Sequence, residues 1–243
     1  MKNSEKTFVL VHAAWHGAWS LDKTKEILEE TGAKVITFDL PGHGKDKTQI
    51  KDVSLHAYVK KVKDEILKLD EPVVLVGHSL AGFVVSQVAE EIPEKIEKLI
   101  FISAMIPYEG KTVFDIVNAD SESQLLQNLI FAEDQSWATV NEETLKNVVY
   151  NKASAQQIAE AAPNLVHQAT QPFFAAVETS ANAFGKIDKT YIVCEYDKIL
   201  SPATQRNLIE KTGISKSLTL DTGHVPNVED PEALANAILK ACY

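Results

Sequence analysis

The chain of 243 residues has only two cysteines, no strongly basic stretch, no internal repeat and no long apolar segment. Cys194 and Cys242 lack the spacing of a metal site or a disulfide framework, so we expect neither. No apolar stretch approaches the roughly 20 residues that a membrane-spanning helix needs. The first residues, MKNSEKTF, lack the apolar core of a signal peptide, which predicts a cytoplasmic protein.

The charge balance is acidic, with 34 acidic and 24 basic side chains and a formal net charge of −10. An excess of negative charge makes nucleic acids and anionic membranes poor partners. The length fits one large α/β domain, or one domain with an insertion. We therefore expect a small-molecule partner, and the sequence leaves a homodimer open.

Short apolar runs alternate with amphipathic segments over residues 1–107 and again over residues 186–243. The apolar runs predict strands at residues 8–11, 35–38, 73–76, 99–102, 190–194 and 217–220. Strands that alternate with helices at short spacing indicate a parallel sheet with helices on both faces. The predicted core is thus an α/β fold with a mostly parallel, six-stranded sheet.

The alternation stops over residues 108–185, where we expect no strand. Helices are expected near residues 113–117, 123–131, 142–149, 154–161 and 171–180. Such an insertion between sheet strands predicts a helical cap over the strand ends. Five aromatic side chains are candidates for an apolar substrate pocket beneath it: Phe114, Phe131, Trp137, Phe173 and Phe174.

The segment Pro72–Gly82, reading PVVLVGHSLAG, joins a buried strand to a helix through a turn with Ser79 at its tip. This is the context of a nucleophile elbow, which usually reads G-x-S-x-G. Here Ala81 occupies the last position and Gly82 follows one residue late. Because alanine is also small, we interpret Ser79 as a candidate nucleophile near the positive end of a helix.

A serine nucleophile needs a base, and the base needs a group that orients it. His224 follows the last strand and is the expected base, while Asp197 follows the fifth strand and is the expected acid. The order Ser, Asp, His is that of α/β hydrolases. Glu195 is the alternative acid, and Asp221 is expected to support the loop.

An oxyanion hole needs two N–H donors. We expect one from Leu80, the residue after the candidate nucleophile, and one from Ala14, in the loop after the first strand. His12 and His16 lie in that first loop, and we expect them to brace it. This chemistry calls for no cofactor and no metal.

Five segments together resemble the α/β-hydrolase family of plant methyl esterases, which also contains hydroxynitrile lyases. They are VLVHAAWHGAW at 9–19, GHSLAG at 77–82, FISAMIP at 101–107, YIVCEYDK at 191–198 and GHVP at 223–226. The resemblance implies an α/β-hydrolase fold without an early antiparallel hairpin. It also implies Ser79, His224 and Asp197 as a catalytic triad, with the N–H groups of Ala14 and Leu80 as oxyanion hole.

Two departures from the family pattern bear on activity. Ala13 stands where the esterases usually have glycine and the lyases threonine, and Val225 stands where the lyases have lysine. A lyase needs that threonine and that lysine to hold the cyanohydrin and the cyanide. We therefore predict a carboxylesterase that forms an acyl-enzyme, with Ala13 and Val225 beside the substrate. A lyase, or a non-catalytic receptor on a hydrolase fold, remains the alternative.

Overall fold

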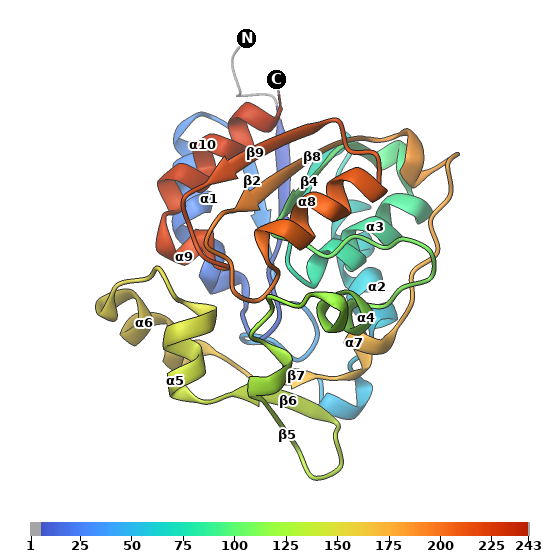
Figure 1. Cartoon of the computed structure of the whole chain (residues 1–243). Helices are drawn as coiled ribbons and strands as arrows, with labels where there is room; N and C mark the ends of the chain where they lie inside the picture. The colour runs from blue at the N-terminus through green and yellow to red at the C-terminus, as the bar shows by residue number, and fades with distance from the viewer. Residues whose placement is uncertain (1–5, 243) are drawn as a thin grey trace.

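A parallel sheet of six strands runs through the centre of the molecule (Figure 1). The computed structural model describes residues 6–242. Along the sheet the order is β2-β1-β3-β4-β8-β9, and each adjacent pair is parallel. The bounds are Thr7–Val11 for β1, Lys34–Thr37 for β2, Val73–His78 for β3, Ile96–Ile102 for β4, Asp188–Cys194 for β8 and Lys216–Leu220 for β9. The predicted α/β fold is confirmed.

Five helices cover the two faces of the sheet (Figure 1). They are α1 (Asp22–Glu30), α2 (Leu55–Ile66), α3 (Ala81–Glu91), α8 (Pro202–Lys211) and α10 (Pro231–Ala241). Alternate strand residues enter different cores, because successive side chains of a strand point to opposite faces. Phe8 and Leu10 pack in the cluster under α1 and α10, whereas Val9 and Val11 pack in the cluster under α2, α3 and α8.

Side-chain caps define where two of these helices begin. The Ser54 side chain accepts a hydrogen bond from the N–H of Ala57 at the start of α2. Asp230 accepts from the N–H of Ala233 at the start of α10. A cap of this kind stabilises a helix by about 1 kcal/mol.

The cap, residues 108–185, contains strands, so the prediction of a strand-free insertion is wrong. Its elements are α4 (Val113–Ala119), β5 (Leu129–Phe131), β6 (Trp137–Val140), α5 (Glu142–Thr144), α6 (Ala155–Ala161), β7 (Gln168–Ala169) and α7 (Gln171–Phe174). The three strands form an antiparallel sheet in the order β5-β6-β7. Runs of two to four residues are too short to show a strand period.

Two expected cap helices are largely absent from the described residues. Over residues 123–131 the chain has only a short 3-10 turn before β5. Here the Gln124 N–H donates to the Lys198 carbonyl and the Ser123 hydroxyl to the Ile199 carbonyl. Long-range contacts thus replace helical ones. The helix expected over 171–180 ends after one turn, at Phe174.

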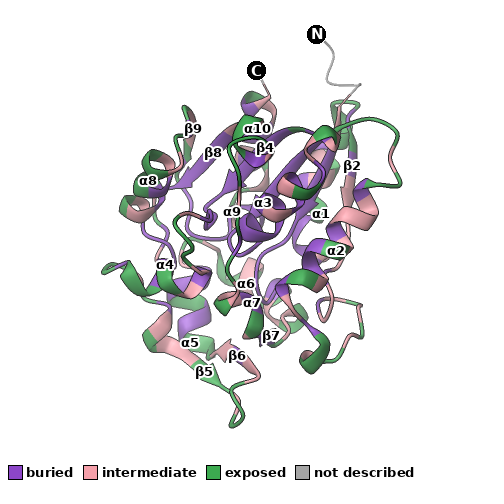
Figure 2. Ribbon diagram, turned by 90° about the vertical axis from the view of Figure 1, so that its right-hand side faces the viewer, coloured by how far each residue is buried: buried purple, intermediate pink, exposed green. Residues whose placement is uncertain are grey.

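The cap lies at the end of the sheet where the parallel strands finish (Figure 1). Figure 2 shows the strands of the central sheet buried, whereas much of β5 and of the turn between β5 and β6 is exposed. Among residues 6–242, no helix has the length and hydropathy needed to cross a bilayer. Loops that follow β1, β3, β4, β8 and β9 therefore meet under the cap, where ligands of such sheets bind.

Candidate active site

Ser79 lies in the sharp turn between β3 and α3, as the elbow pattern predicts. Its φ of 58° is in the left-handed region, which a non-glycine residue adopts only where the surroundings enforce it. Two backbone hydrogen bonds hold the turn against the segment after β4. The Ser79 N–H donates to the Ile102 carbonyl over 3.1 Å, and the Met105 N–H donates to the Ser79 carbonyl over 3.3 Å.

Close packing at the elbow explains the shifted glycine. A Cβ atom at Gly82 would lie 2.1 Å from the Met105 carbonyl oxygen, a distance that no side chain tolerates. The close approach between α3 and the segment after β4 therefore falls on Gly82, and Ala81 fits without a clash of that kind. The pattern G-x-S-x-A-G meets the same steric need as the usual motif.

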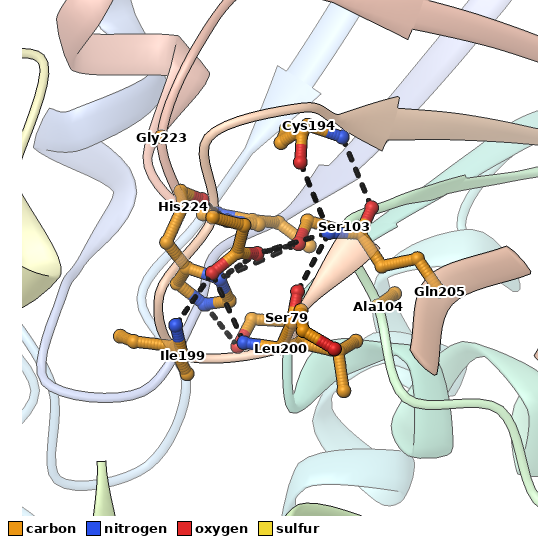
Figure 3. A network of polar contacts seen from close by, with 12 residues as sticks. Ser79, Ser103, Ala104, Cys194, Ile199, Leu200, Gln205, Gly223 and His224 are labelled. Atoms are coloured by element: carbon orange, nitrogen blue, oxygen red, sulfur yellow. Dashed lines mark hydrogen bonds and ion pairs between the residues drawn. The ribbon is translucent and has the colours of Figure 1, made fainter. Parts of the chain in front are cut away.

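Ser79, His224 and Asp197 form a continuous chain of hydrogen bonds (Figure 3). The Ser79 Oγ atom is 2.8 Å from His224 Nε2, and His224 Nδ1 is 2.7 Å from Asp197 Oδ2. All three residues are buried. The structure thus brings together three side chains from the loops after β3, β8 and β9, in the geometry by which an imidazole withdraws a hydroxyl proton.

Asp197 is held by donors on both carboxylate oxygens. Its Oδ1 atom accepts from the N–H groups of Ile199 and Leu200, at 2.7 and 3.0 Å. Its Oδ2 atom accepts from the Gln205 side-chain amide at 3.2 Å and from the Ser103 hydroxyl, besides the imidazole. Charge-assisted hydrogen bonds of this kind fix the position of a carboxylate.

Ser103 and Gln205 were not identified from the sequence. Both are fully buried, which is uncommon for polar side chains. Ser103 follows β4 directly, so a polar residue at the end of a central strand was the available signal. Gln205 could not be found from the sequence, because its contact with Asp197 depends on how α8 packs against the sheet. Its amide also pairs with both backbone polar groups of Cys194 (Figure 3).

The two other acids weighed as partners lie elsewhere. Glu195 pairs with Arg206 at the surface, 2.5 Å apart, and Asp221 is exposed. Within residues 6–242, the side-chain partners of the His224 ring are Ser79, Asp197 and, at 3.4 Å, Ser103.

The N–H groups of Ala14 and Leu80 have no hydrogen-bond acceptor within residues 6–242. Ala14 and Ser79 line the same cavity, and Leu80 begins the turn into α3. An oxyanion hole needs two such donors, so both N–H groups stay candidates for it.

His12 and His16 brace the loop after β1, as predicted. Their Nδ1–H groups donate to the carbonyls of Ala13 and Ala14, at 2.9 and 2.7 Å. Their Nε2 atoms are 3.1 Å from the Leu40 amide nitrogen and 2.7 Å from the Tyr150 hydroxyl, respectively. Burial lowers the pKa of His16 to about 4 and that of His12 well below its usual 6.5. Each ring is therefore neutral and donates once and accepts once.

The loop that carries His224 is supported from two sides. The His78 ring donates through Nε2 to the His224 carbonyl at 2.7 Å, so it faces away from the Ser79 hydroxyl as expected. The Glu229 carboxylate accepts from the N–H of Gly223 at 2.5 Å and from that of Lys152, in the cap, at 3.2 Å. Burial raises the pKa of Glu229 to about 7.

A narrow apolar cavity of about 20 Å³ opens beside Ser79. Phe114 and Phe131 line it, as do Ala14, Trp15, Ser79, Met105, Val113, Val117, Leu125, Leu126, Leu129, Phe173, Phe174 and Ile199. The described residues that line it do not include the three other expected pocket residues, Ala13, Trp137 and Val225. Trp137 stacks on His167 instead, with ring centroids 3.7 Å apart, and Val225 is fully buried.

The fold and the candidate site are those of an α/β hydrolase, and comparison with known proteins gives the same family. The model of the alpha/beta hydrolase family matches residues 8–237, so the chain belongs to that family. Its six-stranded sheet and elbow are the framework on which the candidate site is built.

More particular relatives include plant proteins that are named as methylesterases. Putative methylesterase 12, chloroplastic, of Arabidopsis thaliana is 31% identical and aligns over 97% of this chain and 71% of its own length. Salicylic acid-binding protein 2 of Nicotiana tabacum is 28% identical over 98% of this chain and 97% of its own length. The crystal structure of polyneuridine aldehyde esterase superposes with a TM-score of 0.87 at 22% identity, covering 98% of this chain and 99% of that one. That structural similarity concerns the fold alone.

Proposed function

We propose that the chain is a serine esterase whose catalytic triad is Ser79, His224 and Asp197. The observation that carries the proposal is the unbroken hydrogen-bond chain from the Ser79 hydroxyl through the imidazole to the carboxylate. The family and its named relatives support the broader class, a carboxylic ester hydrolase. No step of this chemistry calls for a cofactor or a metal.

In the first half-reaction, His224 Nε2 takes the Ser79 proton while the serine oxygen bonds to the ester carbonyl carbon. The N–H groups of Ala14 and Leu80 hold the resulting oxyanion. Asp197 accepts from Nδ1–H and stabilises the imidazolium. The carbon–oxygen bond to the alcohol then breaks, and the imidazolium gives its proton to the departing alcohol oxygen.

In the second half-reaction, water attacks the acyl-enzyme and His224 takes its proton. The oxyanion forms again in the same place and collapses, which breaks the bond to the Ser79 oxygen. The imidazolium returns the proton to that oxygen, so the acid leaves and the enzyme is restored.

The apolar lining of the cavity beside Ser79 supports an uncharged substrate. The cavity contains no charged side chain among the described residues that line it, and its aromatic walls suit an aliphatic or aromatic group. Methylesterases are among the named relatives, which favours a small alcohol. We therefore propose esters of apolar acids with small alcohols as the substrate class.

The test is hydrolysis of p-nitrophenyl acetate and a panel of methyl and aryl esters by wild type, Ser79→Ala and His224→Ala. Each substitution should lower kcat by several orders of magnitude, on the order of 10⁴- to 10⁶-fold. A matched control is Ser86→Ala, because Ser86 is also buried, in α3, and its hydroxyl donates to the Gly82 carbonyl of the same helix. A Ser79→Ala protein that hydrolyses these esters at the wild-type rate would refute the proposal.

Other activities are separated by two further measurements. Release of cyanide from mandelonitrile that depends on Ser79 would indicate a lyase. Tight ligand binding without labelling of Ser79 by a fluorophosphonate would indicate a receptor. A cytoplasmic location and a homodimer remain predictions, and chloroplastic proteins are among the relatives.

A further inference from the structure

Trp15 is fixed at the boundary between the core and the cap. It follows Ala14 in the loop after β1, has a φ of 63° and is 6% exposed. Its indole Nε1–H donates to the Ala138 carbonyl in β6 over 2.9 Å. Its own carbonyl accepts from the N–H of Val166 over 2.9 Å. The indole therefore has a set orientation, held by two separate segments of the cap.

Trp15 lines two cavities. The first is the cavity of about 20 Å³ beside Ser79. The second measures about 30 Å³ and lies in the cap, lined by Trp15, His16, Thr139, Val140, Leu145, Val149 and Leu165. Among the described residues, Trp15 is the one that lines both. A flat ring held in this way can separate two spaces that would otherwise be joined.

The second cavity has the character of a site for an alkyl chain. Four aliphatic side chains line it. Val140 comes from β6, Leu145 and Val149 from the π-helical turn Leu145–Val149, and Leu165 from the segment that follows α6. The His16 ring contributes no free polar group, because Nδ1 donates to the Ala14 carbonyl and Nε2 accepts from Tyr150. Thr139 is the other polar side chain there. An apolar chain loses few hydrogen bonds by entering such a space.

We propose that Trp15 is a specificity-determining partition: it restricts wild type to esters with short chains, and the cavity behind it accepts a longer alkyl chain once the indole is removed. This inference rests on the proposed esterase activity of Ser79. It predicts that one side chain limits the length of the ester's alkyl chain, and that substitution of Trp15 leaves the reacting groups in place. A Trp side chain typically buries roughly 150–250 Å², so its removal joins the two cavities into a much longer one.

The experiment compares wild type with Trp15→Ala and with Trp15→Leu, which retains an apolar side chain in case alanine prevents folding. Two ester series are used: p-nitrophenyl acetate to decanoate, and methyl to octyl benzoate. Each methylene that becomes buried should raise kcat/KM by about fourfold. The ratio of kcat/KM for octyl over ethyl chains should rise by about tenfold or more in one series. A ratio is used because damage to the loop lowers both values equally.

Val149→Ala is the matched control, since Val149 lines the second cavity and is not among the described residues that line the first. Alone it should leave the chain-length ratio unchanged, because the indole still closes the passage. Combined with Trp15→Ala it should extend the preference by a further one or two methylenes, or about four- to fifteenfold for the longest chain. Equal effects of Val149→Ala in both backgrounds, or an unchanged ratio in both series for both Trp15 variants, would overturn the proposal.

Binding of 1-octanol separates this inference from the proposed activity. It is titrated calorimetrically into Ser79→Ala and into Ser79→Ala/Trp15→Ala, neither of which needs to turn over. The double variant should bind about tenfold more tightly, since more of the chain becomes buried. Equal affinities would overturn the partition even if the wild type is an esterase. Tighter binding would support it even if no ester is hydrolysed.

Discussion

The Ser103 hydroxyl donates to the same carboxylate oxygen of Asp197, Oδ2, that accepts the Nδ1–H of His224 (Figure 3). Ser103 Oγ is also 3.4 Å from His224 Nδ1, so the three groups form a compact triangle. Ser103 has a φ of 38° and follows the central strand β4, which places its side chain beside the acid. The Ser103 hydroxyl and the His224 imidazole therefore share the negative charge on Asp197 Oδ2.

Removing that donor should change the pH dependence of catalysis. In Ser103→Ala, Asp197 becomes a stronger acceptor for the imidazole, which favours imidazolium. The acidic limb of the kcat/KM profile should therefore move to higher pH, and kcat should fall about tenfold, the order of one hydrogen bond to a charged group. Steady-state kinetics with an activated ester from about pH 5 to pH 9 measure both. An unshifted profile, like that of the control Ser86→Ala, would show that Ser103 only fills space.

Glu229 should make stability depend on pH. Burial raises the pKa of this carboxyl from 4.5 to about 7, so the folded state binds its proton more tightly than the unfolded state. The resulting stabilisation is complete below about pH 4.5 and is lost as pH rises through about 7. Glu229→Gln does not titrate, so its stability relative to wild type should be roughly 1–3 kcal/mol greater at pH 8 than at pH 5.

Urea unfolding at the two pH values measures this difference. The matched control is Glu143→Gln, which changes an exposed glutamate in α5 and should give curves parallel to those of wild type. If the free energies of unfolding of Glu229→Gln and wild type also change in parallel between the two pH values, the Glu229 carboxyl does not change its protonation on folding in this range.

Gly82 should be indispensable, whereas Ala81 should not. A methyl group at Gly82 must displace the Met105 carbonyl, which belongs to the segment that holds the elbow. Gly82→Ala should therefore destabilise the fold by several kcal/mol, about 3 or more, as overpacking of a rigid site does. Ala81→Gly restores the usual motif and should lower stability by only about 1 kcal/mol, the helix propensity of glycine.

Thermal melting and the rate of fluorophosphonate labelling at Ser79 report the two effects. Similar melting temperatures for both variants, with labelling at the wild-type rate in Gly82→Ala, would contradict the steric explanation of the shifted motif.

The core was predictable because its signals are local. Six apolar runs gave the strands, and small residues around Ser79 gave the elbow before any contact was known. The positions of His224 and Asp197 after strands were enough to place them at one edge of a parallel sheet. The helix predicted over residues 123–131 is wrong because this segment forms hydrogen bonds with the loop after β8, and no local sequence pattern indicates such contacts.

The pocket was less predictable than the polar site. Trp137 was expected to line it on account of its aromatic ring alone, but that ring stacks on His167. Trp15 belongs to the motif VLVHAAWHGAW, yet its contact with two cavities depends on the cap, whose strands were not predicted. The side chains that contact the pocket depend on how the cap packs on the core, and no periodic pattern in the sequence indicates that packing.

Tyr150 connects the cap to the candidate oxyanion hole, so its hydroxyl should affect kcat more than KM. It lies 2.7 Å from His16 Nε2, and the ring's Nδ1–H holds the Ala14 carbonyl at 2.7 Å. Tyr150→Phe leaves the buried Nε2 of His16 without a donor and should loosen Ala14, whose N–H is the proposed oxyanion donor. Losing an oxyanion donor outright lowers kcat about 10²- to 10³-fold, so loosening it should lower kcat by about tenfold.

Steady-state kinetics with one ester separate the two parameters. Tyr196→Phe serves as the control, because Tyr196 is 49% exposed and lies on the loop after β8. If Tyr150→Phe matches that control in kcat, the hydroxyl is not needed to hold the loop. If instead KM rises with kcat unchanged, Tyr150 acts on substrate binding and the connection through His16 is wrong.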